Sequence, residues 1–116
     1  MVIFNNLFKN KKEKQLVNKI ENILLEMGFE RVKINLAQTM EVGISEIDCY
    51  KKEQLYCRIN VFDFGDKSKR LVVIEYAYSL YEAERILFDD GVPIYVDTPI
   101  KKILDIIRKE IANRLL

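Results

Sequence analysis

The chain contains no histidine, and its two cysteines, Cys49 and Cys57, lie eight positions apart. Histidine is the usual general base near neutral pH, the commonest metal ligand, and the group that activates serine or cysteine nucleophiles. A structural zinc site needs four soft ligands, which two cysteines cannot supply. We therefore predict a non-enzymatic protein with no catalytic residue, no cofactor and no metal site.

Glu75 stands out among the carboxylates, because the segment Leu71–Tyr78 is otherwise apolar or aromatic. A strand register that opposes apolar to apolar residues places Arg58 opposite both Glu75 and Asp48. The plainer interpretation is a solvated cross-strand ion cluster that adds at most about 1 kcal/mol per pair. The sharper interpretation is a recognition surface whose carboxylates and tyrosines bind a basic partner. Catalysis is the least favoured interpretation, since no partner base is evident.

Two other charged clusters have both a structural and a ligand-binding interpretation. The segment Asp89–Gly91 lacks the further spaced carboxylates of a Ca²⁺ loop, so a solvent-facing turn that ends a helix is favoured. Four lysines between residues 9 and 14 could contact nucleic acid, but no glycine-rich loop or aromatic RNA-binding signature accompanies them. A solvated helix start is favoured there, and nucleic acid is the less favoured partner.

Helical periodicity predicts two long helices that would support these residues. Apolar side chains recur on one stripe over 11–27, and Gly28 follows as a left-handed cap. A second stripe runs over 99–115, with Thr98 as the expected N-cap and Pro99 at the first helical position.

Shorter elements are predicted between the long helices. Strand-like runs occupy residues 29–37, 41–51 (with a bulge near 45–46), 55–64 and 71–78, followed by a short edge strand over 92–96. A turn over 65–69 separates two of these strands. Ser79 and Glu82 match a capping box, which predicts a short helix over 80–88 that ends at 89–91.

Register determines which side chains share a face of the predicted sheet. We expect a hairpin around Glu53 with the pairs Ile47–Ile59, Asp48–Arg58, Cys49–Cys57 and Tyr50–Tyr56. The next hairpin is expected to pair Ile59–Ile74, Arg58–Glu75 and Cys57–Tyr76. One core face then carries Ile47, Cys49, Cys57, Ile59, Val61, Ile74 and Tyr76. Asp48, Tyr50, Tyr56, Arg58, Asn60, Val73 and Glu75 lie on the opposite face.

These elements predict a single α+β domain over residues 1–116. Its 49% hydrophobic content supports one core, covered by the two long helices. We expect one antiparallel sheet of four to five strands in the order α-β-β-β-β-α-β-α. No apolar run is long enough to span a membrane, and no export signal is evident, so a cytoplasmic protein with reduced cysteines is expected.

The second half of the chain carries motifs of a known kind. Residues 73–77 read Val-Ile-Glu-Tyr-Ala, residues 87–91 read Leu-Phe-Asp-Asp-Gly, and Tyr95 follows. Over residues 71–112 the chain resembles small immunity proteins of bacterial polymorphic-toxin systems, with their EYA strand, short acidic helix ending in F(E/D)DG, and C-terminal helix. The resemblance implies family-like positions at Glu75, Tyr76, Asp89, Asp90 and Gly91. It also implies that the protein binds and blocks one cognate toxin in the producing cell.

We therefore expect a non-catalytic immunity protein with an acidic and aromatic contact surface. The expected partner-binding residues are Asp48, Tyr50, Tyr56, Arg58, Glu75, Glu82, Asp89 and Asp90. Charge is unevenly distributed: residues 1–33 and 99–116 together carry twelve basic and six acidic side chains, while 34–98 carry seven and twelve. The alternative hypothesis is a small nucleic-acid-associated or regulatory protein that uses the basic terminal helices. A monomer and a homodimer both remain open.

Overall fold

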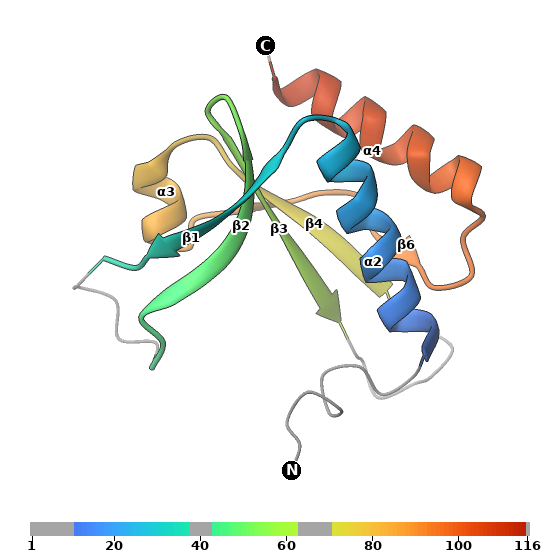
Figure 1. The fold of residues 1–116 in the computed structure, drawn as a ribbon, viewed down its shortest axis with the longest axis horizontal. Coiled ribbons are helices and arrows are strands. Elements are labelled where there is room, and N and C mark those ends of the chain that lie inside the picture. The colour runs from blue at the N-terminus through green and yellow to red at the C-terminus, as the bar shows by residue number, and fades with distance from the viewer. Residues whose placement is uncertain (1–10, 38–42, 63–70, 116) are drawn as a thin grey trace.

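The computed structural model describes residues 11–37, 43–62 and 71–115, which form three helices and six strands (Figure 1). In chain order they are α2 (Lys11–Glu26), β1 (Glu30–Asn35), β2 (Glu46–Lys52), β3 (Leu55–Phe62), β4 (Leu71–Ala77), α3 (Leu80–Glu84), β5 (Asp89–Asp90), β6 (Ile94–Tyr95) and α4 (Ile100–Arg114). The predicted α+β class and both long helices are confirmed. The predicted order lacks one element, because residues 89–90 form a strand and not the end of a helix.

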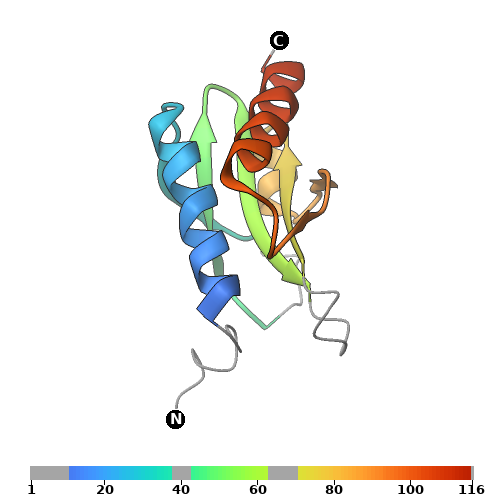
Figure 2. The ribbon, with the colours of Figure 1, turned by 90° about the vertical axis from the view of Figure 1, so that its right-hand side faces the viewer.

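All strand pairs are antiparallel, in the order β1-β2-β3-β4, and both β5 and β6 pair with β4. Helices α2 and α4 lie side by side on one face of this twisted sheet, and α3 lies on the other (Figures 1 and 2). Within the described ranges, no helix combines the length and the apolar content needed to cross a membrane.

One of the two predicted registers is confirmed and the other is wrong. β3 and β4 pair as expected, with Arg58 opposite Glu75. Between β2 and β3, however, Tyr50 lies opposite Cys57, and not opposite Tyr56, so the pairing is displaced by one residue. Because neighbouring residues of a strand point to opposite faces, this slip turns the whole of β2 over relative to the expectation.

The slip divides the apolar residues between two cores. The larger core lies under α2 and α4 and includes Leu16, Ile20, Leu24, Leu55, Cys57, Val72, Ile74, Tyr76, Ile94, Ile103, Ile107 and Ile111. The smaller core lies under α3 and includes Ile34, Ile47, Cys49, Tyr56, Ala77 and Ala83. The predicted single core face is therefore wrong for Ile47 and Cys49, which pack on the α3 side.

The predicted end of α2 is confirmed, and the predicted cap of α4 is wrong. Gly28 has the expected left-handed φ of 95°, and the Phe29 amide donates to the Leu24 carbonyl at 3.0 Å, which closes α2. At the start of α4, Pro99 is itself the cap and no side chain caps the helix, so the expected Thr98 cap is wrong. Ile100, which lies within the predicted apolar stripe over 99–115, is exposed.

α3 and β2 differ from their predicted ranges in where they end or begin. α3 ends at Glu84 and not at residue 88, and Ile86 adopts a left-handed φ of 54° just beyond it. β2 begins only at Glu46, so Ile44 lies before the strand and not across a bulge within it. The predicted turn over 65–69 and the first residues of the predicted strand 41–51 fall outside the described residues.

Candidate functional site

Two of the predicted contact residues, Asp48 and Tyr50, lie on the face of the sheet opposite to the predicted one. Asp48 and Tyr50 share the face covered by α2 and α4, because Tyr50 lies opposite Cys57. The Tyr50 hydroxyl donates to the carboxylate of Glu21 in α2, and burial together with this bond raises the Tyr50 pKa to about 12. Asp48 is exposed and lies 4.0 Å from Lys33. The predicted Asp48–Arg58 pair is therefore not formed.

The predicted ion cluster around Glu75 forms, but its third member is Asp90 and not Asp48. Arg58 Nε lies 3.7 Å from Glu75 Oε1, and Asn60 Nδ2 donates to Glu75 Oε2 at 3.3 Å. Strand β5 brings Asp90 directly opposite Glu75. Burial raises the pKa of Glu75, and Asp90 raises it further, while Asn60 and Arg58 oppose the shift. Two carboxylates thus lie opposite one another on the α3 side of the sheet, and one of them, Glu75, is paired with the Arg58 guanidinium.

Three predicted contact residues have other positions or roles. Tyr56 is only 6% exposed and belongs to the smaller core. Glu82 completes the predicted capping box: its amide donates to Ser79 Oγ at 3.2 Å, and its carboxylate accepts from the Tyr78 amide at 2.8 Å. Asp89 lies opposite Tyr76 and so points away from the face that carries Asp90.

The segment around α3 exposes large apolar side chains that the sequence interpretation missed. Tyr78, Leu80, Tyr81 and Leu87 are exposed by 40%, 48%, 61% and 53%. We call these four residues, together with Asp90, the α3 surface. The short length of α3 could have indicated this exposure. A helix of five residues buries only one narrow stripe, which Ala83 occupies here, so Leu80 and Tyr81 face solvent.

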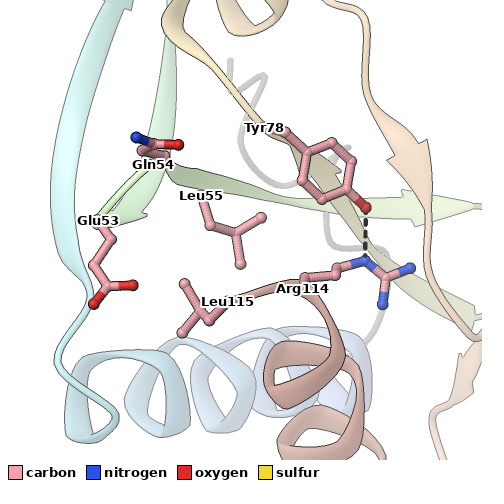
Figure 3. A pocket seen from close by; sticks show the side chains of 6 residues that line it. All are labelled: Glu53, Gln54, Leu55, Tyr78, Arg114 and Leu115. Carbon is pink, nitrogen blue, oxygen red and sulfur yellow. Dashed lines mark hydrogen bonds between the residues drawn. The ribbon is translucent and has the colours of Figure 1, made fainter.

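Two hollows adjoin the α3 surface where β4 leads into α3. One, of about 330 Å³, is lined by Glu53, Gln54, Leu55, Tyr78, Arg114 and Leu115 (Figure 3). The other, of about 350 Å³, is lined by Lys51, Glu53, Gln54, Tyr56, Tyr78, Ser79 and Leu80. Tyr78 and the β2–β3 turn contribute to both. Arg114 Nε donates to the Tyr78 hydroxyl at 3.1 Å, which fixes this ring between the hollows.

A buried network attaches β5 to α4. Glu110, only 7% exposed, accepts from the Tyr76 hydroxyl at 3.2 Å and from the Val92 amide at 2.9 Å. The Arg114 guanidinium lies 4.1 Å from the centroid of the Tyr76 ring and 3.7 Å from Glu110 Oε2. This network holds the backbone around Gly91, and with it Asp90, in a defined position.

The two cysteines of the described residues lie apart from one another in buried positions. Cys49 and Cys57 are both free and buried, and they point to opposite faces of the sheet, so their predicted apposition is wrong. Burial raises the pKa of Cys49 to about 11 and that of Cys57 further still, which keeps both protonated at neutral pH. Over the described ranges, no group of three potential metal ligands comes together.

Comparisons with known proteins identify no relative of this chain. No family model matches it, and neither a curated protein nor a solved structure gives a match.

Proposed function

We propose that this chain is a non-catalytic immunity protein that binds and neutralises a cognate bacterial toxin through the α3 surface. The observation that carries the proposal is the exposure of Tyr78, Leu80 and Tyr81 beside two hollows. Exposed apolar groups gathered in one place are typical of protein-binding sites, and tyrosine is among the residues that contribute most to binding energy. The hollows offer space for side chains of the partner.

The charge beside this apolar group favours a basic partner. Asp90 and Glu75 face one another across β5 and β4 with Arg58 as the nearby cation, which leaves one negative charge in excess when both acids are ionised. A positive side chain of the toxin would balance it and speed association. Tyr81 already stacks against the Arg85 guanidinium, 3.7 Å from the ring centroid, so the ring accepts cationic contact.

Two of the motif residues, Glu75 and Asp90, lie on the α3 side of the sheet. Glu75 and Tyr76 belong to β4, and Asp89 and Asp90 form β5. The Glu110 network orders β5 before any partner arrives, which lowers the conformational entropy lost on binding. The protein would act in the cytoplasm of the producing cell, as a monomer or a homodimer.

Co-expression tests this function. The product of the gene adjacent to the one for this chain is expressed alone and together with the chain, and growth and complex formation are measured. We expect the neighbouring product to be toxic, the chain to restore growth, and the two proteins to co-purify. A toxic neighbour that is neither bound nor neutralised by the chain would overturn the proposal.

Paired variants test the surface. The double substitution Leu80→Ala and Tyr81→Ala should weaken toxin binding at least tenfold, which corresponds to about 1.4 kcal/mol. The control carries Leu25→Ala and Ile100→Ala, which remove exposed apolar groups from α2 and α4 on the opposite face. Equal losses in both variants, with unfolding midpoints unchanged, would show that the α3 surface is not the contact.

A further inference from the structure

The outer sides of α2 and α4 form a basic face. Eight lysine and arginine side chains on these helices are exposed: Lys11, Lys12, Lys14, Lys19, Lys101, Lys102, Arg108 and Lys109. We call these eight residues the basic helical face. The two helices lie side by side on the same side of the sheet (Figure 2), so their cations contribute to one field.

Most acidic residues of α2 and α4 are buried or half-buried and so do not contribute to this face. Glu13 and Glu110 are buried, and Glu21 is half-buried against Arg31, with 2.5 Å between its Oε1 and the guanidinium. Glu26 and Asp105 are the exposed acids of α2 and α4. Among the described residues, Lys12 is the member of the basic helical face that has an ion-pair partner, Asp97 at 3.4 Å. An exposed pair of this kind is weak and screened by salt.

The cations are arranged in rows. Lys12 and Lys19 are seven residues apart, as are Lys101 and Arg108, and Lys102 and Lys109. At about 100° per residue, seven residues return to nearly the same side of a helix, roughly 10 Å further along its axis. Each row therefore spans a length comparable to about three base pairs of a duplex, whose strands each carry one phosphate per 3.4 Å.

The uncharged side chains of α2 and α4 indicate which polyanion this face binds: a membrane surface, a single strand or a duplex. A membrane-surface helix needs a large apolar face directed at the lipid, but the apolar stripes of α2 and α4 are buried in the core. Single-stranded nucleic acid is bound through aromatic side chains that stack on its bases, and neither helix contains an aromatic residue. A duplex, bound through its phosphates alone, requires neither feature.

We propose that the basic helical face binds the phosphate backbone of double-stranded nucleic acid without sequence specificity. Helix α3 lies on the opposite side of the sheet from this face, and duplex binding does not depend on the proposed toxin binding. Binding would come from the release of counterions condensed on the duplex, so it should weaken steeply with salt. The logarithm of the association constant should fall by about 0.9 for each phosphate contacted per tenfold rise in salt.

Fluorescence anisotropy with the full chain and labelled 20-base-pair DNA and RNA duplexes tests the proposal between 20 and 200 mM salt. The face variant carries Lys19→Gln, Lys101→Gln and Lys109→Gln. The control variant carries Lys33→Gln, Lys51→Gln and Arg85→Gln, which lie off the two helices; both changes take the net charge from +1 to −2. We expect the face variant to lose at least tenfold in duplex affinity at low salt and the control to change less than threefold.

Several outcomes would overturn the proposal. They are the absence of duplex binding by the wild-type chain at 20 mM salt, equal losses in the face and control variants, or tighter binding to a single strand of the same length. Stronger binding to phosphatidylserine vesicles than to either duplex would instead assign the face to a membrane surface. Circular dichroism of all three proteins confirms that they are folded, so a loss of binding is attributable to charge.

Discussion

Gly91 lies where the acidic segment packs closely against β4 and α4. Its amide donates to the Ile74 carbonyl at 2.8 Å, and a Cβ at this position would lie 2.5 Å from Glu110 Oε2 and 2.7 Å from that carbonyl oxygen. Because the carbonyl is backbone and cannot move aside alone, Gly91→Ala should lower the free energy of unfolding by about 2 kcal/mol. Urea denaturation measures the loss.

Gly43 supplies the matched control for this substitution. It has a left-handed φ of 77°, but a Cβ there would meet nothing within 4 Å. Gly43→Ala therefore incurs only backbone strain, about 1 kcal/mol. A Gly91→Ala variant as stable as Gly43→Ala would contradict the close approach at Gly91.

The two thiols should be inert in the folded protein. Cys49 and Cys57 are buried and point to opposite faces of the sheet, and burial raises the pKa of Cys49 to about 11. At pH 7.5 we expect neither thiol to react with a disulfide reagent on the timescale of minutes, and both to react once the chain is unfolded in urea. Fast reaction of either thiol without denaturant would contradict this placement.

Among the elements, the register between β3 and β4 could be predicted from the sequence, and the register between β2 and β3 could not. β3 and β4 each carry a charged residue within an apolar run, and opposing Arg58 to Glu75 also opposes apolar to apolar residues. β2 buries Ile47 and Cys49 on one face, and α3 covers this face, which we expected the two long helices to cover. The alternation of β2 shows which residues share a face but not which helix covers that face, and the packing of α3 decides.

The turn itself offers a test of the observed register. Lys52 and Leu55 are paired, so Glu53 and Gln54 form a two-residue turn in which Glu53 has a left-handed φ of 56°. Glycine adopts this φ without steric cost, so Glu53→Gly should raise the free energy of unfolding by up to about 1 kcal/mol. Gln54→Gly, at a position without positive φ, should lower it by about 0.5–1 kcal/mol. A reversed order of the two urea midpoints would contradict the observed turn.

The contact between β4 and β5 makes stability depend on pH through Glu75. Burial and Asp90 raise its pKa above the ordinary value of 4.5, so the folded state favours the protonated acid. The stabilisation is complete below that ordinary value and is lost as pH rises through the raised pKa. Glu75→Gln removes the ionisation, so its stability relative to the wild type should increase between pH 4 and pH 7. Urea midpoints for both proteins at the two pH values provide the measurement, and a relative stability that falls with pH would contradict the raised pKa.

At the scale of the whole molecule, the nearly neutral total charge conceals two different faces. The sequence predicted basic terminal helices and a more acidic middle, and the structure places α2 and α4 opposite α3 across the sheet. The composition of the α3 surface was harder to predict. It depends on where a short helix ends and on the pairing of β5 with β4, and both are tertiary effects.

This division predicts that the two proposed activities can be removed separately. Leu80 and Tyr81 belong to α3, on the other side of the sheet from α2 and α4, and distant sites without shared partners perturb a protein independently. Leu80→Ala with Tyr81→Ala should weaken neutralisation of the toxin and leave duplex binding within about twofold of the wild type. Lys19→Gln, Lys101→Gln and Lys109→Gln together should have the opposite effects. Growth rescue and duplex anisotropy, measured on both variants, test the separation, and loss of both activities in either folded variant would show that a single surface serves both.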